Sequence, residues 1–449
     1  MVNLRGGVIV KERKKSFLFY LVVMSVIIAT LFPGSRAAAE SDILDIKGHS
    51  AILVDANTGM ILYEKESDTA LPTASMTKMM TEYLVLEAIK DGKISWEQET
   101  GISEYVYKIS QFRSLSNVPL RLDGTYTVKE LYEAMAIYSA NGATIALAEL
   151  VAGSETNFVK MMNDKAEELK LVNYKFVNST GLNNKDLLGN HPKGTDQAEE
   201  NLMSAKATAT LAYNLLKDYP EVLDTASIPT KVFREGTEDS IDMINWNEML
   251  PGLGSEYAGV DGLKTGSTDL AGYCFTGTAT KGDTRFISVV MKTDSRTARF
   301  VETKKLLDYG FSNFEKLEVV AAGYQEKGKK TVKVQKGKEN TVEIEAAKPI
   351  ALLVKRGEKE NYKPVVKISK KSVEAPVKEG TKVGTVTVEY KGEGSLSFLT
   401  EKGGELVKSD IVTTDNVEKA NWFVLLMKAI GGFFGDLWTS SAEGIKGLF

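Results

Sequence analysis

Apolar and polar residues alternate at both ends of one long region of the chain and follow a helical period between them. Residues 44–62 alternate around an Asn-Thr-Gly turn, which predicts a β-hairpin, and residues 258–295 again have the pattern of strands. Strands at both ends with helices between them predict one mixed α/β domain over about residues 44–312, whose sheet unites its two ends. The segments with helical periodicity are 73–90, 128–150, 155–170, 204–217 and 300–309.

The alternation changes character from about residue 315 onward. Short Val-rich stretches are separated by Lys, Glu and Gly, and prolines fall among them. This pattern predicts a small antiparallel β module of about 100 residues. No group of its residues is typical of catalysis. The stretches are Thr331–Val334, Thr341–Glu345, Val365–Ile368 and Val383–Tyr390.

The N-terminus has the order of charges and apolar residues that is typical of a secretory signal peptide. A basic stretch at 11–15 precedes the uncharged run Phe17–Phe32, and Ala37–Ala39 supply small residues for cleavage. We expect cleavage near Ala39, with an uncleaved N-terminal anchor as the alternative because the apolar run is slightly long. Cleavage would remove six basic residues and one acidic residue, so the formal net charge would change from −4 to −9.

The C-terminus contains an apolar stretch that is also amphipathic. Residues 422–438 read WFVLLMKAIGGFFGDLW. On a helix, Lys428, Asp436 and the glycines share one sector, and aromatic and aliphatic residues fill the opposite one. Because it contains charges and glycines, the stretch suits the membrane interface better than a full span. The alternative is a terminal helix that packs on the protein's own core.

Composition restricts the chemistry available to the chain. The charge of −4 gives no basic excess, so we expect no nucleic-acid partner. Cys274 is the one cysteine, so an intrachain disulfide and a Cys-rich metal site are excluded; we expect it to be a small buried residue. The two histidines, His49 and His191, are too far apart for a helical zinc motif, and His191 is expected on a surface loop. We therefore expect no metal and no cofactor.

Ser75 and Lys78 form the first candidate motif. They lie three residues apart at the start of an apolar helical segment, after Pro72, so both lie on one face of its first turns. A lysine whose pKa is lowered can take the proton of a serine and make it a nucleophile. Free backbone N–H groups at the helix start can stabilise an oxyanion. Ser-x-x-Lys is a weak signal alone, although the chain contains it only once.

Ser139-Ala140-Asn141 is the second candidate motif and interrupts the helical segment 128–150. A second hydroxyl can relay a proton, and the amide of Asn141 can bind a peptide group of a substrate. Taken alone, such a sequence is usually a helix cap.

Lys264-Thr265-Gly266 is the third candidate motif and lies in a predicted strand. A strand edge can pair with an extended peptide. Lys264 and Thr265 can bind a terminal carboxylate, and Gly266 allows a close approach of the substrate backbone. The N–H of Ser267 could join that of Ser75 in an oxyanion hole. Taken alone, the motif is equally compatible with a solvated strand end.

The three motifs in this order resemble the signature of penicillin-binding proteins and class A β-lactamases. The segments PTASMTKMMT, YSANGATIALAE and GVDGLKTGSTDLAGYC are most similar to the low-molecular-mass penicillin-binding proteins that are serine-type D-alanyl-D-alanine carboxypeptidases. The resemblance extends to the β module and the amphipathic tail. Gly142 departs from the family pattern, in which many members have Asp after Ser-Ala-Asn. Because it adjoins the motif without replacing a motif residue, we expect this departure to adjust the activity at most, without removing it.

The resemblance implies a fold and a reaction. The fold is a serine β-lactamase/transpeptidase-like domain, an antiparallel sheet with helices, followed by a small all-β domain and an amphipathic helix. Ser75 would attack the penultimate D-Ala carbonyl of a peptidoglycan pentapeptide with Lys78 as general base. Ser139 would assist proton transfer, and water would hydrolyse the acyl-enzyme. β-Lactams would acylate Ser75 stably as covalent inhibitors.

The resemblance also implies substrate contacts and a location. Asn141 would hold the substrate amide, and Lys264 and Thr265 would hold the terminal carboxylate. The enzyme would act in peptidoglycan maturation at the outer face of the bacterial cytoplasmic membrane, held peripherally by its C-terminal helix. The expected parts are a signal peptide (1–39), a catalytic domain (40–312), a β-rich domain (313–415) and an anchoring helix (416–449).

Two other functions are compatible with parts of the pattern. A class A β-lactamase would need a Glu that activates the deacylating water, and Glu199-Glu200-Asn201-Leu202 has the wrong order for its Glu-x-x-Leu-Asn segment. A wall-binding scaffold with a relict site is disfavoured because the motif residues are intact. A further segment, Gly323–Lys330, nearly matches a phosphate-binding loop, but it lacks the required Ser or Thr and leads into a strand, so we interpret it as a turn.

Overall fold

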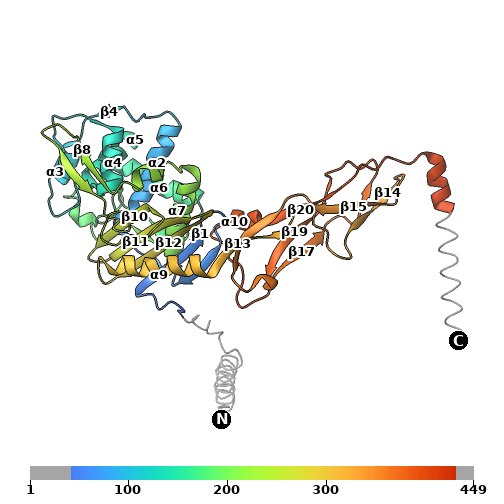
Figure 1. Ribbon diagram of the computed structural model, residues 1–449. Helices are drawn as coiled ribbons and strands as arrows, with labels where there is room; N and C mark the ends of the chain where they lie inside the picture. The colour runs from blue at the N-terminus through green and yellow to red at the C-terminus, as the bar shows by residue number, and fades with distance from the viewer. Residues whose placement is uncertain (1–41, 431–449) are drawn as a thin grey trace, which may run out of the picture. The chain divides into compact units, whose positions relative to one another are not determined.

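The computed structural model describes residues 42–430 of the 449-residue chain (Figure 1). The expected leader, residues 1–39, and the distal part of the expected tail, residues 431–449, lie outside the described residues. Within the described range, no helix is both long enough and apolar enough to cross a membrane.

A five-stranded antiparallel sheet forms the centre of the N-terminal domain, in the order β10-β11-β12-β1-β2. β1 pairs with its hairpin partner β2 on one side and with β12 on the other, where Val54 lies opposite Ile287. The predicted hairpin and the predicted union of the two ends of this region are therefore confirmed. The strands are β1 (Gly48–Asp55), β2 (Ile61–Lys65), β10 (Val260–Thr268), β11 (Gly272–Lys281) and β12 (Thr284–Thr293).

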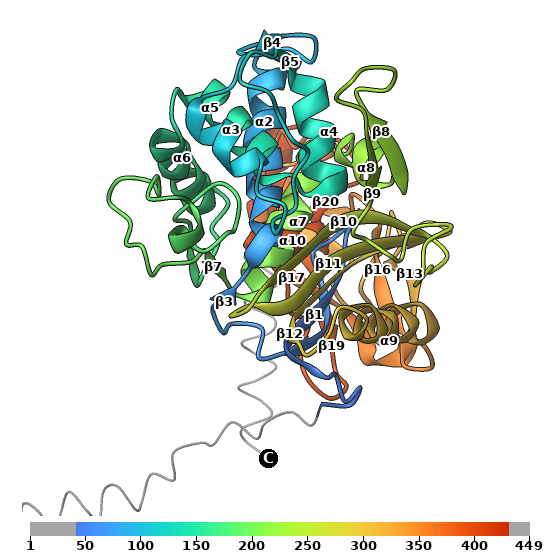
Figure 2. The same ribbon diagram turned by 90° about the vertical axis from the view of Figure 1, so that its left-hand side faces the viewer.

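Helices cover both faces of this sheet. The predicted closing helix is α9 (Ala298–Asn313), which lies against one face, and the other helices of the domain gather on the opposite side (Figures 1 and 2). Two short helices of this side lack a recognisable helical repeat in the sequence. The helices on this side are α2 (Lys78–Lys90), α3 (Glu104–Ser110), α4 (Val128–Tyr138), α5 (Asn141–Ala152), α6 (Glu155–Glu168), α7 (Ala205–Asp218) and α8 (Val222–Ala226).

α2 is the central helix of the helical side, and other helices surround it in Figure 2. Ten of its thirteen residues are buried, which is the pattern of a helix enclosed on all sides. Its first residue is Lys78, and the 3-10 turn η1 (Ala74–Thr77) leads directly into it. The second motif lies between α4 and α5, where the predicted helix 128–150 is broken. The core of the domain thus holds the first two motifs.

The C-terminal domain consists mainly of β-strands, as predicted. A six-stranded sheet has the order β17-β19-β20-β15-β14-β18, and β13 pairs with β16 in a separate sheet. β13, β16, β18 and β20 were not among the predicted strands; β16, for example, reads IALLVK and lacks an alternating pattern. The strands are β13 (Phe314–Val320), β14 (Thr331–Gln335), β15 (Thr341–Ala346), β16 (Ile350–Lys355), β17 (Tyr362–Ile368), β18 (Ser372–Glu374), β19 (Lys382–Tyr390) and β20 (Lys408–Thr413).

A segment of the C-terminal domain pairs with the β1–β2 turn of the N-terminal domain. The N–H of Ile61 donates to the carbonyl of Ser397 and that of Leu399 donates to the carbonyl of Gly59, each at 2.9 Å. The short helix α10 (Glu401–Leu406) follows, and a Cβ on Gly403 would lie 2.3 Å from the Thr58 carbonyl oxygen. No pattern of residues in the sequence indicates this contact.

Candidate active site

The helix start positions Ser75 next to Lys78, as the motif predicts. In η1 and the first turn of α2, Lys78 Nζ lies 3.1 Å from Ser75 Oγ. Ser75 is half-buried, whereas Lys78 is fully buried. The nucleophile candidate is thus accessible while the candidate base is shielded from water.

Lys78 is surrounded by hydrogen-bond acceptors. Besides Ser75 Oγ, its Nζ lies 2.8 Å from Asn141 Oδ1 and 2.7 Å from the Thr180 carbonyl oxygen. Burial lowers the pKa of Lys78 well below its ordinary value, the charge of Lys264 lowers it further, and the carboxylate of Glu82 opposes both effects. When the amine is neutral, it can accept the proton of Ser75, which is the requirement for a general base.

Ser139 joins the second motif to the third. It caps the C-terminus of α4 in the left-handed region, with φ of 59°, and Lys264 Nζ lies 3.0 Å from its hydroxyl oxygen. Burial also lowers the pKa of Lys264. Asn141, two residues after Ser139, contacts Lys78. The Lys78–Ser75 and Lys264–Ser139 contacts therefore belong to one connected group of side chains.

Asn141 is held at the N-terminus of α5 by the loop that follows α3. Its backbone N–H and its Nδ2 donate to the carbonyl of Ser116, at 2.9 and 3.0 Å. An Asn amide has two N–H donors, so one remains for a substrate carbonyl. The adjacent Gly142 donates its N–H to Asn117 Oδ1 at 2.9 Å.

Close packing explains the departure at Gly142. A Cβ at this position would lie 2.8 Å from the Cβ and 3.1 Å from the Cα of Ser110 on α3. An Asp side chain does not fit unless α3 moves away. The glycine is therefore matched to the position of α3 in this chain.

The third motif lies on β10, which is the edge strand of the five-stranded sheet. Lys264 and Thr265 are buried, and Ser267 is exposed near the end of the strand. A Cβ on Gly266 would lie 2.6 Å from the Thr73 carbonyl oxygen and 3.2 Å from the Ser75 backbone nitrogen. Only glycine permits β10 to approach the nucleophile turn this closely.

The site contains further residues that sequence reasoning did not identify. The Thr180 carbonyl contacts Lys78, and backbone groups leave no residue signature. Glu82 lies buried one turn after Lys78, and burial raises its pKa against the influence of both lysines. Its spacing of four residues from Lys78 could have indicated it. Arg299 of α9 is buried, and its Nη1 lies 3.4 Å from the carbonyl oxygen of Gly266.

The remaining residues singled out in the sequence lie apart from these contacts. Cys274 is fully buried in β11, as predicted. His191 is half-buried in the loop after η2 (Asn184–Asp186), where its Nδ1 lies 3.2 Å from Thr195 Oγ1.

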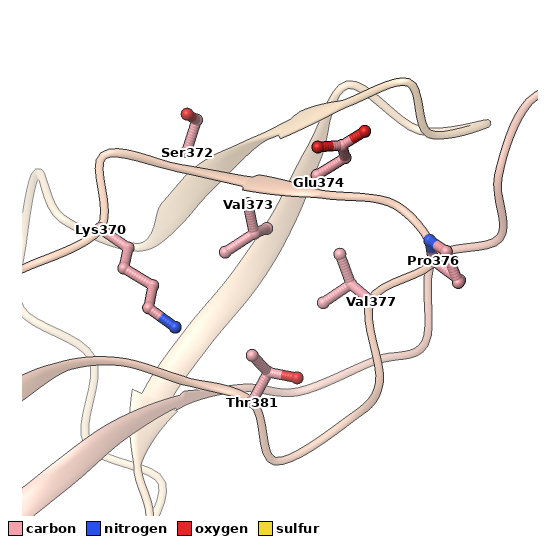
Figure 3. A pocket seen from close by; sticks show the side chains of 7 residues that line it. All are labelled: Lys370, Ser372, Val373, Glu374, Pro376, Val377 and Thr381. Atoms are coloured by element: carbon pink, nitrogen blue, oxygen red, sulfur yellow. The ribbon is translucent and has the colours of Figure 1, made fainter.

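A cavity of about 290 Å³ lies in the C-terminal domain, beside the edge strand β18 (Figure 3). None of the predicted site residues lines it. Its lining residues are Lys370, Ser372, Val373, Glu374, Pro376, Val377 and Thr381.

Comparison with known protein families agrees with the fold and the motif geometry. The family model described as D-alanyl-D-alanine carboxypeptidase matches residues 35–295. The model described as the C-terminal domain of penicillin-binding protein 5 matches residues 314–419. The chain belongs to the D-alanyl-D-alanine carboxypeptidase family, and the resemblance noted in the sequence is confirmed.

Individual relatives match most of the chain. The D-alanyl-D-alanine carboxypeptidase DacF of Bacillus subtilis is 33% identical over 414 residues, which are 91% of this chain and 97% of that protein. The crystal structure of a peptidoglycan synthesis regulatory factor (PBP3) from Streptococcus pneumoniae is 38% identical, with a TM-score of 0.69, and covers 83% of this chain and 100% of its own. Penicillin-binding protein 5 of Haemophilus influenzae is 29% identical, with a TM-score of 0.66, and covers 83% and 98%.

Proposed function

We propose that this serine-type D-alanyl-D-alanine carboxypeptidase releases the terminal D-Ala of peptidoglycan pentapeptides through an acyl-enzyme on Ser75. The observation that carries the proposal is the contact of 3.1 Å between Ser75 Oγ and a fully buried Lys78, whose pKa is lowered by burial. A hydroxyl next to a neutral amine is the pairing that nucleophilic catalysis without histidine requires.

Acylation begins when Lys78 takes the proton of Ser75 and Ser75 Oγ attacks the penultimate D-Ala carbonyl. The resulting oxyanion is stabilised by the backbone N–H groups of Ser75 and Ser267. This pairing is favoured because Gly266, the neighbour of Ser267, approaches the Ser75 nitrogen closely.

Collapse of the tetrahedral intermediate breaks the peptide bond, and the leaving D-Ala nitrogen needs a proton. Ser139 supplies it and is in turn hydrogen-bonded to Lys264 at 3.0 Å. The proton that Lys78 took from Ser75 replaces the one that Ser139 gave to the amine, so the Lys78 amine is neutral again. Water then attacks the ester carbonyl, Lys78 takes a proton from the water and passes it to Ser75 Oγ as the ester bond breaks, and the shortened peptide leaves with a new carboxyl group.

Substrate binding uses Asn141 and the edge strand β10. Asn141 donates its remaining Nδ2 hydrogen to the carbonyl of the substrate amide. Lys264 and Thr265 bind the terminal carboxylate, a pairing in which a charged donor roughly doubles the strength of the hydrogen bond. A β-lactam carries a carboxylate and a reactive carbonyl in the same arrangement and acylates Ser75 as a stable inhibitor. Among the relatives, penicillin-binding protein D2 of Listeria monocytogenes has been crystallised in an ampicillin-bound form.

We further propose that residues 416–449 hold the exported enzyme at the outer face of the cytoplasmic membrane, after removal of residues 1–39. Residues 422–430 of this segment are helical, and most of their apolar side chains are exposed, including Trp422 at 75%. On the same helix, Lys428 Nζ donates to the carbonyls of Gly337 and Lys338, at 2.9 and 2.7 Å. The polar face is thus engaged by the β domain, which leaves the apolar face free for lipid.

The catalytic domain is taken as residues 40–312 and the β domain as 313–415.

The test is incubation of the full chain with a muramyl pentapeptide, with D-Ala measured in the supernatant. We expect one D-Ala per peptide and slow turnover of penicillin. Rapid penicillin hydrolysis without D-Ala release would instead identify a β-lactamase, and absence of both would identify a wall-binding scaffold.

A further inference from the structure

Two buried acceptor atoms next to the active site have no hydrogen-bond donor among the described residues. They are Oδ1 of Asn183 and Oε2 of Glu200. The side chains belong to residues that are only 8% and 9% exposed. An unpaired buried acceptor is costly, so native proteins rarely keep one that no ligand or water satisfies.

The two residues lie on neighbouring backbone segments. The N–H of Asn184 donates to the Glu199 carbonyl at 3.1 Å, which brings the backbone at Asn183 next to that at Glu200. Both orphaned acceptors therefore come from one local structure: Asn183 immediately precedes η2, and Glu200 lies at the end of the loop that joins η2 to β7 (Leu202–Met203).

This structure contacts both the turn that carries Ser75 and the strand β10. On one side, the Thr73 N–H donates to the Asn201 carbonyl at 3.2 Å, two residues before Ser75. On the other side, the side chain of Thr268 lies next to that of Glu200. Glu200 thus lies at the Thr268 end of β10, close to the turn that carries the nucleophile.

The order of residues on β10 determines which part of a substrate reaches this end. If Lys264 and Thr265 bind the terminal carboxylate, the peptide runs along the strand edge past Gly266 and Ser267. The residue that precedes the two D-alanines then lies beside Thr268. This inference rests on the proposed orientation of the substrate.

Charges near Glu200 favour a cation or a hydrogen-bond donor. The carboxylates of Asp186 and Asp269 and the ammonium group of Lys185 are the charges that act most strongly on Glu200. Both orphaned atoms are acceptors, and a carboxylate and an amide oxygen together suit an ammonium group.

We propose that Asn183 and Glu200 form a specificity subsite that binds the side-chain amine of the residue preceding D-Ala-D-Ala. The donor on the substrate satisfies the two buried acceptors, and a peptide without it leaves them unpaired. Glu200 is then a specificity-determining residue outside the three motifs.

The test compares three peptides that differ only in this side chain: Nα-acetyl-Lys-D-Ala-D-Ala, its Nε-acetylated form and the norleucine analogue. We expect the wild-type enzyme to prefer the free amine by roughly tenfold to a hundredfold in kcat/KM. Glu200→Gln should reduce this ratio to near unity. Glu199→Gln, which alters the neighbouring half-buried carboxylate, should leave the ratio unchanged.

The wild-type ratios alone can overturn the proposal. Equal kcat/KM for the three peptides would mean that water, and not substrate, satisfies the two acceptors. An unchanged ratio in Glu200→Gln would also contradict it. Absence of D-Ala release from every peptide by the wild-type enzyme would instead refute the proposed function or its orientation of substrate.

Discussion

A buried lysine loses the hydration that stabilises its charged form, and Lys78 is buried together with a second lysine and a carboxylate. Burial and Lys264 lower its pKa, and Glu82 raises it. Between the lowered pKa and the ordinary value of 10.5, the unfolded chain binds a proton at this residue and the folded chain does not. Lys78 therefore contributes a free energy of unfolding that rises with pH across this window.

The rate of acylation should follow the neutral form of Lys78. We expect acylation by a fluorescent penicillin to rise with pH through the lowered pKa and then to level off. In Glu82→Gln, loss of the carboxylate should move this acidic limb to lower pH by up to about one unit. The measurement is the second-order acylation rate from pH 5 to 10, with the exposed Glu97→Gln as control. A limb that moves to higher pH in Glu82→Gln would contradict this assignment.

At the scale of elements, the site depends on the close approach of β10 to the turn before α2. Gly266 is the position where the two backbones meet, with its hypothetical Cβ 2.6 Å from the Thr73 carbonyl oxygen. A carbonyl oxygen of the backbone cannot rotate away as a side chain can. The separation between β10 and the turn that carries Ser75 is therefore set by the absence of one methyl group.

Gly266→Ala should push β10 away from η1. We expect a loss of at least about tenfold in penicillin acylation, because a shift of about 1 Å misplaces the oxyanion donor. Overpacking of this kind typically lowers the free energy of unfolding by about 1–3 kcal/mol. Gly101→Ala is the matched control, because a Cβ there meets nothing within 4 Å. Acylation at the wild-type rate in Gly266→Ala, measured beside a thermal melt, would contradict the close approach.

The elements that the sequence predicted are those with a clear period. The hairpin alternates, α2 and α7 repeat with the helical period, and Ser139-Ala140 visibly interrupts a helical run. β16 is an apolar run without alternation, and short helices such as α8 have no full repeat, so neither could be predicted.

The motif residues could be predicted because their side chains carry the chemistry. The Thr180 carbonyl, the loop carbonyl of Ser116 and the orphaned Glu200 could not be predicted, since their roles arise only from tertiary placement. In the sequence, Glu200 is part of a segment that fails to match the β-lactamase pattern, and nothing else in its sequence neighbourhood indicates a role.

At the scale of the whole molecule, the C-terminal domain engages its neighbours at two places. One is the pairing of Leu399 and Ser397 with the β1–β2 turn, and the other is the set of oxygens around Lys428. The third of these oxygens is Asn340 Oδ1, at 2.7 Å. Because Lys428 lies on the polar face of the helix 422–430, the exposed apolar side chains of this helix are directed away from the oxygens that bind Lys428.

Trp422, Leu426 and Ile430 lie four residues apart and share one helix face, with exposures of 75%, 48% and 42%. The double variant Leu426→Asp/Ile430→Asp should lose binding to lipid vesicles, because charged groups penetrate the interface poorly. Val301→Asp, at a residue that is 49% exposed on α9, is the control and should bind as the wild type does. Retention of the double variant on vesicles in a sedimentation assay would contradict the proposed anchor.

A covalent acyl-enzyme on Ser75 would be detected by intact-protein mass spectrometry. After incubation with penicillin, the wild-type chain should gain the mass of one penicillin, and peptide mapping should locate it on Ser75. Ser75→Ala should gain no mass and should release no D-Ala from a pentapeptide, although its fold is kept. A penicillin adduct on Ser75→Ala, or D-Ala release by that variant at the wild-type rate, would contradict an acyl-enzyme on Ser75.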